Sequence, residues 1–255
     1  MLKIYFRLFI LSVLTAYCSP AARVQKVEMT EYNLSSKENA MVDSLIIKKV
    51  QPYKERMEAD MNQPLAVFAE ALDKGQPESK LGNFVSDACL FMTRENYHPS
   101  DSHPVDFAFF NNGGLRNSLP KGSVTKGNIF ELMPFENELI ILTLHAVTVK
   151  KIFNFIASKG GVPVAGIKMG IQNGIPANIF INGVVFDSTK VYKVVTSDYL
   201  ANGGDQCFFL QDAVNREYIG LKIRDALINY LSEKGKKNEI IHTNLDKRIT
   251  LSNAK

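Results

Sequence analysis

A chain of 255 residues that is 45% hydrophobic and 22% charged is long enough to bury one good hydrophobic core. Its formal charge of +4 comes without the clustered Lys and Arg of a nucleic-acid-binding protein, so no nucleic-acid partner is expected. The three cysteines are too few for a disulfide framework, and the absence of a C-x-x-C pair excludes a thiolate zinc site.

The N-terminal segment has the pattern of a secretory signal. Two cations precede an apolar block, Leu8 to Tyr17, that is too short to span a membrane. Cys18 follows the block, where a lipoprotein signal places its lipid-bearing cysteine, although the residue before it is normally small. We expect residues 1–17 to be a signal peptide, Cys18 to be lipidated, and residues 18–34 to form a tether. Plain cleavage near Ser19 to Ala21 is the alternative.

These features predict an exported protein, periplasmic or on the outer cell envelope, attached to the membrane by lipid. The globular part is expected at residues 35–255. Periodicity and turn residues predict its elements, which are in chain order a helix starting near Ser35 and interrupted at Pro52, a strand at 64–73, a helix at 78–96, a strand at 105–110, a short helix at 125–133, a strand at 138–144, a helix at 146–158, a hairpin at 178–186, a strand at 190–197, a helix at 218–234 and an edge strand at 248–251.

Two of these elements have strong local signals. In the helix at 78–96, Ser79 can cap the first turn, and the apolar residues recur every three or four positions. In the hairpin, Asn182-Gly183 lies between apolar runs and predicts a tight turn with both residues at positive φ. Helices and strands mix without strict alternation, so the fold class is α/β (mixed α+β), a single domain with a mixed β-sheet flanked by helices.

Standard catalytic patterns are missing or incomplete. Asp101-Ser102-His103 has the D-x-H form that opens a two-metal phosphatase site, but no Asn-His pair follows. There is no G-x-S-x-G nucleophile turn, no phosphate loop and no dinucleotide fingerprint. Cys207, in a glycine-rich loop, is a conceivable nucleophile without a histidine nearby in sequence. We therefore expect no metal ligands in this chain.

Three loops share one chemical character. FNNGGLR follows the strand at 105–110, PFEN precedes the strand at 138–144, and YLANGGDQC follows the strand at 190–197. Loops at strand ends are common ligand sites. Their glycines allow close approach of a ligand, Arg116 can bind phosphate or carboxylate oxygens, and Asn111 and Asn112 can donate and accept hydrogen bonds. A purely structural role for each loop is the alternative, but the three together indicate a ligand site.

The same residues carry a family resemblance. The chain resembles the C-terminal, substrate-binding domain of the 5′-nucleotidases over about residues 40–251. The matching motifs occur in order, and they are LGNFVSDA at Leu81–Ala88, N-x-G-G-I/L-R at Asn111–Arg116, G-x-I/L-x-x-L/M-x-P-F at Gly127–Phe135, and Y/F-L-A-N-G-G-D at Tyr199–Asp205.

The resemblance implies roles for individual residues. Asn111 matches the residue that bonds the base, Arg116 the arginine on the phosphate or sugar side, and Phe135 one of two rings that sandwich the base. Asp212 lies where the family places an acid for the ribose hydroxyls. The substrate-binding set implied is Asn111, Gly113, Gly114, Arg116, Phe135, Asn202, Gly203, Gly204, Asp205, Cys207, Phe208 and Asp212.

Departures from the family pattern accompany these matches. Cys207 occupies the second ring's position, unless a shift of one residue brings Phe208 there. A second family arginine has no clear counterpart, since Pro77 falls near its position and Lys80 is a weak substitute. In the full-length enzymes, a separate N-terminal domain carries two metals and the hydrolytic chemistry. We expect this chain to be too short to contain that domain.

The resemblance therefore implies the nucleotide-binding domain of a split 5′-nucleotidase. It would recognise base and ribose for nucleotide dephosphorylation, while a separate metallophosphatase chain supplies two divalent metals. This chain would hold no cofactor and no catalytic residue. Two alternatives stay open, which are a stand-alone hydrolase of nucleotide phosphate esters that uses Asp205 or Cys207, and a scaffold that has lost nucleotide affinity.

Overall fold

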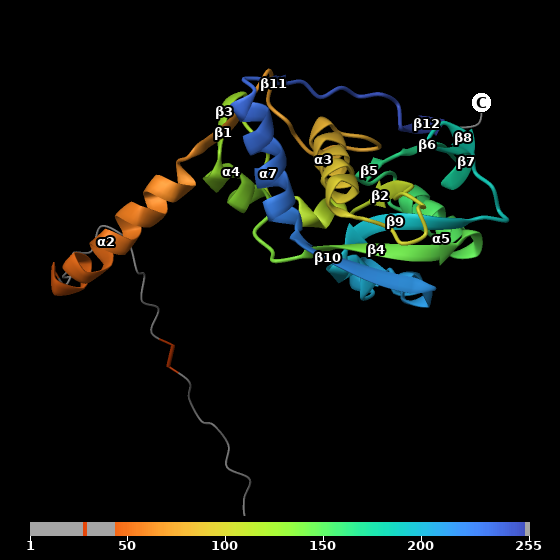
Figure 1. The fold of residues 1–255 in the computed structure, drawn as a ribbon, viewed down its shortest axis with the longest axis horizontal. Helices are drawn as coiled ribbons and strands as arrows, with labels where there is room; N and C mark the ends of the chain where they lie inside the picture. The colour runs from red at the N-terminus through yellow and green to blue at the C-terminus, as the bar shows by residue number, and fades with distance from the viewer. Residues whose placement is uncertain (1–27, 30–43, 253–255) are drawn as a thin grey trace, which may run out of the picture. The chain divides into compact units, whose positions relative to one another are not determined.

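The computed structural model describes residues 28–29 and 44–252 (Figure 1). The chain divides into a unit that ends at Lys49 and a unit from Val50 to Lys255, and the second contains the sheets. The expected signal peptide, Cys18, the helix start near Ser35 and all of the tether except residues 28–29 lie outside the described residues.

The first described helix, α2 (Ser44–Met61), continues through Pro52, so the predicted interruption there is wrong. A proline inside a helix removes one backbone donor and crowds the preceding turn, but the residues on both sides of Pro52 keep their helical assignment. Among the described helices, none is long and apolar enough to cross a membrane.

The remaining elements are, in chain order, β1 (Pro64–Phe68), α3 (Lys80–Asn96), β2 (Phe107–Phe109), η1 (Asn112–Gly114), β3 (Gly122–Thr125), α4 (Lys126–Leu132), β4 (Glu138–His145), α5 (Ala146–Ser158), β5 (Val164–Ala165), β6 (Ile167–Gln172), β7 (Ile175–Ile181), β8 (Val184–Val185), β9 (Val191–Ser197), α6 (Asp198–Ala201), η2 (Gly204–Gln206), η3 (Phe208–Asp212), β10 (Asn215–Lys222), α7 (Ile223–Lys236), β11 (Ile240–Ile241) and β12 (Ile249–Ser252).

Within residues 44–252 the strands form three mixed sheets, with the orders β11-β1-β3, β10-β4-β9-β2-β5 and β12-β6-β7-β8. Each sheet contains one parallel pair, which is β1–β11, β2–β9 and β6–β12 respectively, and its other pairs are antiparallel. The predicted fold class is confirmed. The prediction of a single sheet did not separate the three.

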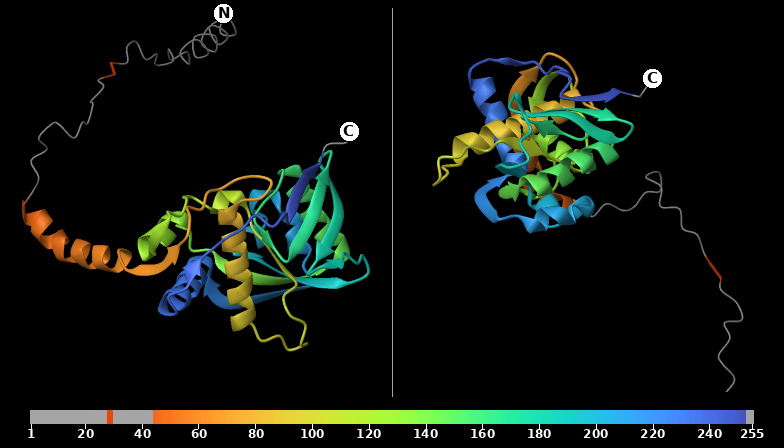
Figure 2. Two further views of the ribbon diagram at one scale, coloured as in Figure 1. Left: turned by 90° about the horizontal axis from the view of Figure 1, so that it is seen from above. Right: turned by 90° about the vertical axis from the view of Figure 1, so that its right-hand side faces the viewer.

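Strand β4 of the five-stranded sheet is buried on both faces. From β4, Leu139 and Ile141 enter the core that includes residues of α3 and α7, whereas Ile140 and Leu142 enter the core that includes residues of α5. Helices α3 and α7 pack against each other on the first side (Figure 1 and Figure 2). Burial on both faces explains why this strand is a continuous apolar run instead of an alternating one.

The local signals for α3 and the hairpin are confirmed. The Ser79 hydroxyl accepts a hydrogen bond of 3.0 Å from the Gly82 amide and caps α3. Asn182 and Gly183 connect β7 and β8 with φ values of 48° and 80°, the left-handed conformation that a two-residue hairpin turn of this type requires.

Two predicted boundaries are wrong. The strand predicted at 64–73 ends at Phe68, and Leu72 makes only an isolated bridge to Leu119. The helix predicted at 218–234 begins only at Ile223, because the residues before it form β10 against β4. Gly220, with φ 66°, has a left-handed backbone that does not fit a right-handed helix.

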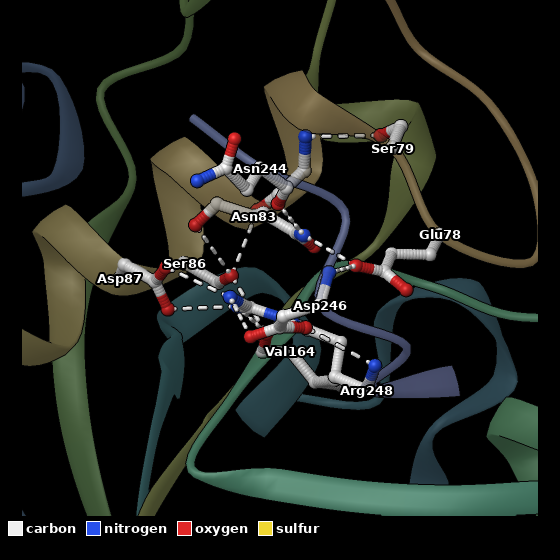
Figure 3. A network of polar contacts seen from close by, with 10 residues as sticks. Glu78, Ser79, Asn83, Ser86, Asp87, Val164, Asn244, Asp246 and Arg248 are labelled. Atoms are coloured by element: carbon white, nitrogen blue, oxygen red, sulfur yellow. Dashed lines mark hydrogen bonds and ion pairs between the residues drawn. The ribbon is translucent and has the colours of Figure 1, made fainter. Parts of the chain in front are cut away.

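Residues 242–248, which we call the C-terminal strap, link β11 of the three-stranded sheet to β12 of the four-stranded sheet. Arg248 fixes the strap to α3 (Figure 3). It donates to both carboxylate oxygens of Asp87, at 2.7 and 2.9 Å, and to both oxygens of Asp246, at 2.9 and 3.0 Å. It also donates to the Val164 carbonyl at 2.8 Å, so all five guanidinium N–H groups are used.

Each charged group in this network stabilises the ionised form of its partners. Burial by itself would raise the pKa of Asp246, but hydrogen bonding and attraction from Arg248 outweigh it and lower that pKa. Burial would likewise lower the pKa of Arg248, and its two aspartate partners reverse this and raise it. Asn83 adds a bond of 2.9 Å from its Nδ2 to the Asn244 carbonyl. The strap is therefore stable in the ionised state.

Candidate nucleotide-binding site

A cleft of about 360 Å³ brings together groups from all three loops of the sequence analysis. Its lining consists of Asn111, Gly113, Gly114, Arg116, Phe135, Asn137, Tyr199 and Asp205. Six of these residues belong to the set that the family resemblance implied. Asn137 and Tyr199 were not in that set.

Strand pairing explains why the loops meet. β2 and β9 are parallel neighbours, so their carboxyl ends lie at the same edge of the sheet. β4 is antiparallel to β9, with Leu139 opposite Ser197, so the amino end of β4 lies at that edge as well. The segments after β2, before β4 and after β9 therefore converge, in the manner of ligand sites at the strand ends of α/β proteins.

Asp205 is the centre of the polar side of the cleft. Asn111 donates from Nδ2 to one carboxylate oxygen of Asp205 at 2.6 Å, and the Tyr199 hydroxyl donates to the other at 2.9 Å. The Asp205 amide in turn donates to the Tyr199 hydroxyl at 3.2 Å. The hydrogen bond to Asp205 raises the pKa of Tyr199, so the phenol stays protonated. One carboxylate thus orients both an amide and a ring.

The backbone around Asp205 is unusual. Asp205 has φ 51° and Gly203 has φ 96°, both in the left-handed region that L-residues other than glycine seldom adopt. At Gly204, an added Cβ would lie 2.5 Å from carbons of the Tyr199 ring. Only glycine allows the ring to lie so close to the backbone here.

Arg116 and Phe135 lie near each other in the lining and are both exposed. The Arg116 guanidinium carbon lies 6.0 Å from the centroid of the Phe135 ring, and its Nη1 donates to the Gly113 carbonyl at 3.3 Å. The Phe135 ring is 45% exposed, although phenylalanine is usually buried. The guanidinium keeps donors for an anion, and the ring keeps a face for an apolar partner.

Glu136 anchors the loop that carries Phe135. Its carboxylate bonds to Lys222 at the end of β10 and to Arg224 in the first turn of α7. Hydrogen bonds from Lys222 and then Arg224 lower the pKa of Glu136. The Arg224 guanidinium also lies over the Phe130 ring at 4.1 Å. Contacts to two other elements thus fix the position of Phe135.

Comparison with known proteins places the domain. The family model described as "5′-nucleotidase, C-terminal domain" matches residues 59–212. The chain belongs to this family. Among curated relatives, it is 28% identical over 176 residues to a 5′-nucleotidase of Vibrio vulnificus and 26% identical over 211 residues to an apyrase of Tabanus yao, covering 64% and 72% of this chain. It spans only 30% and 38% of those two proteins.

A solved structure gives the same assignment. A 5′-nucleotidase precursor from Thermus thermophilus superposes with a TM-score of 0.67 at 25% identity, over 82% of this chain and 43% of that one. A NAD nucleotidase of Haemophilus influenzae shares the fold, with a TM-score of 0.63 at 17% identity. Membership in the 5′-nucleotidase C-terminal family connects the domain to nucleotide metabolism.

The other residues that the family pattern implied lie outside the cleft lining. The Asn202 side chain accepts from Arg216 at 3.1 Å. Gly203 packs under the Phe208 ring and Gly204 under Tyr199, so both glycines shape the turn. Asp212 is exposed and pairs with Lys151 at 3.3 Å.

Cys207 and Phe208 were the two residues considered for the family's second ring, and neither of them lines the cleft. Cys207 is completely buried in the core that includes α5, and burial raises the pKa of its thiol to about 12. It is therefore neither a stacking surface nor a thiolate at neutral pH. Phe208 is 63% exposed but does not line the cleft.

The residues near the position of the family's second arginine are engaged elsewhere. Lys80 pairs with Glu70, and the Pro77 carbonyl lies where a side chain on Gly161 would have to be. In the described part of the chain, no group of three or more His, Cys, Asp and Glu side chains could hold a metal ion. His103 pairs with Asp106 at 3.1 Å.

Of the two lining residues outside the expected set, Asn137 and Tyr199, the second has the larger side chain in the cleft. Tyr199 is 45% exposed and lines the cleft. From the sequence it was named only as the first residue of the YLANGGD motif and was assigned no role. The two glycines that follow within five positions were the available signal, because they can bring a turn back under the ring.

Proposed function

We propose that this domain binds the base and ribose of a nucleoside or nucleotide, and that it acts as the recognition part of a 5′-nucleotidase in nucleotide catabolism. The observation that carries the proposal is the convergence of Asn111, Arg116 and Phe135 on one cleft beside Asp205. These residues come from segments that are separate in sequence.

The chemistry of the lining fits such a ligand. The Phe135 face can stack on a base, a contact that contributes about 1–3 kcal/mol in aromatic platforms. The Asn111 amide can meet the hydrogen-bonding edge of a base. Arg116 can bind a phosphate with charge-assisted hydrogen bonds. The volume of about 360 Å³ lies in the usual range for small-molecule sites, about 300–1,000 Å³.

The hydrolytic step is proposed to reside in a separate metallophosphatase chain that holds two divalent metals. The chain spans less than half the length of the relatives it matches. The reactive residues considered for a stand-alone hydrolase have other roles, since Cys207 is buried and protonated and Asp205 holds Asn111 and Tyr199. Export and lipid attachment at Cys18 complete the proposal.

Calorimetry with adenosine, AMP and ribose 5-phosphate tests the binding function. Phe135→Ala and Arg116→Ala are each expected to weaken AMP binding by about ten-fold, or about 1.4 kcal/mol. Lys121→Ala, which removes an exposed cation elsewhere, is the matched control for Arg116 and should bind as the wild type does. Absence of binding to any nucleoside or nucleotide at millimolar concentration would refute the function.

Two further experiments test the partner and the anchor. Addition of the domain to candidate envelope metallophosphatases should change their rate of phosphate release from AMP, and no change with any of them would refute the split enzyme. Radiolabelled fatty acid should enter the wild-type protein in cells but not Cys18→Ser. Equal labelling, or none, would remove the lipid anchor from the proposal.

A further inference from the structure

The cleft has two half-exposed rings in its lining, Phe135 and Tyr199. They come from different segments at this edge of the sheet, since Phe135 precedes β4 and Tyr199 follows the neighbouring strand β9. Among the described residues, the two rings make no ring–ring contact with each other. The space between them is therefore not closed by their own packing.

We propose that Tyr199 is the second aromatic wall of the site, on the face of the ligand's base opposite Phe135. This inference rests on the proposed binding function and assigns a residue that the family pattern did not. The second stacking ring is then Tyr199, before the G-G-D turn, and not the residue at position 207 after that turn. Aromatic side chains thus stack on both faces of a flat heteroaromatic base, although Cys207 is buried.

The structure holds the Tyr199 ring in place from two sides. Behind it lies Gly204, whose hydrogen in place of a side chain leaves room for the ring. At its tip, the hydroxyl donates to Asp205 and accepts from the Asp205 amide. A ring fixed in this way loses little conformational entropy when a ligand stacks on it, which favours binding.

Asp205 is a positioning residue in this arrangement. The same carboxylate accepts from Tyr199 and from Asn111, so it couples the stacking ring to the amide that meets the base edge. One N–H of Asn111 Nδ2 is used by Asp205, which leaves the second N–H and the carbonyl oxygen of that amide for the ligand. The amide can therefore meet a base edge that presents a donor, an acceptor or both.

The rival for this role is Phe208, the family position shifted by one residue. Its ring packs on Gly203, where an added Cβ would lie 2.8 Å from a ring carbon, and it is absent from the cleft lining. A shift of Phe208 into the cleft would give up that contact. The two residues can be separated by substitution.

The test uses the mature protein, with adenosine as a ligand that has a base and ribose 5-phosphate as one without. Tyr199→Ala is expected to weaken adenosine binding by ten-fold or more and to leave ribose 5-phosphate unchanged. Tyr199→Phe keeps the ring, so its loss should stay within about three-fold. Phe208→Ala and the exposed-ring control Tyr218→Ala should bind adenosine as the wild type does. Circular dichroism checks that each variant is folded.

A fluorescence version uses the absence of tryptophan from the chain. Tyr199→Trp introduces a single reporter, and a stacked purine should quench it in a saturable manner. Tyr218→Trp carries the same reporter outside the cleft and should not respond. This readout reports contact between the ring at position 199 and the base directly, in addition to affinity.

The outcomes separate the two proposals. If wild type binds adenosine and Tyr199→Ala binds it equally well, or if Phe208→Ala alone weakens it, the assignment of Tyr199 is wrong and the binding function stands. If the wild type binds no nucleoside or nucleotide, the binding function fails and the assignment fails with it. If Tyr199→Phe loses as much affinity as Tyr199→Ala, the hydroxyl and not the stacking face is responsible, which also overturns the assignment.

Discussion

Replacement of Arg248 by methionine should release the C-terminal strap and destabilise the domain. The side chain is only 11% exposed and makes five hydrogen bonds. Charge-assisted hydrogen bonds contribute about 1.5–3 kcal/mol each, but a sum over five would exceed what one residue can contribute, because they are not independent. Loss of one partner of a buried ion pair costs about 3–5 kcal/mol.

The lower end of that range applies, because the side chains of Asp87 and Asp246 are 52% and 55% exposed and water can solvate them once Arg248 is gone. We expect a loss of about 3 kcal/mol in the free energy of unfolding. At about 2–4 °C per kcal/mol for a domain of this size, the melting temperature should fall by about 6–12 °C.

Urea unfolding followed by circular dichroism measures this difference. Lys150→Met, at an exposed position of α5, is the matched control and should change stability by less than about 0.5 kcal/mol. A loss below about 1 kcal/mol for Arg248→Met would refute the reasoning. It would mean that the β12–β6 ladder holds the strap without help from the ion pairs.

Three other predictions concern a cap, a titration and a thiol. Ser79→Ala should cost about 1 kcal/mol of unfolding free energy through loss of the α3 cap, and Ser79→Asp, which keeps an acceptor, should cost less; urea curves compare the two. Because the pKa of Asp246 is lowered in the folded state, its ionised form contributes stability above its ordinary pKa of about 3.9. That contribution is lost as pH falls through the lowered value, so the stability gap between wild type and Arg248→Met should narrow below about pH 4. In a Cys18→Ser background, the buried Cys89 and Cys207 should react with a disulfide reagent at pH 8 only after urea is added, and fast reaction of the native protein would contradict the burial of both.

Much of the fold could be predicted from the sequence where a signal is local. The cap at Ser79 and the turn at Asn182-Gly183 depend on neighbours within a few residues, and both were predicted correctly. The start of α7 was misplaced because apolar residues at 219 and 221 fit both a helix and a strand, and only pairing with β4 decides between them. The division into three sheets likewise depends on contacts between distant segments.

In the candidate site, too, some residues could be predicted from local sequence and others depend on the folded structure. Asn111, Arg116 and Phe135 were identified from chemistry and motif, and the cleft brings them together. That they bind a nucleotide stays a prediction. The presence of Tyr199 in the lining instead of Cys207 depends on how the turn after Ala201 folds back, and Gly203 and Gly204 were the only sequence signal for it. Side-chain type predicts what a residue can do, whereas backbone conformation decides which residue is in position to do it.

The long stretch of sequence between β6 and β12 affects the order in which this sheet can be completed. β12 pairs with β6, with Ile249 opposite Met169, so this edge of β6 stays unpaired until residues 249–252 have been synthesised. Unpaired strand edges are sites of aggregation, and domains form from the N-terminus during synthesis. Nascent chains that stall before Arg248 would therefore expose β6, and a chaperone or a protease would encounter this edge first.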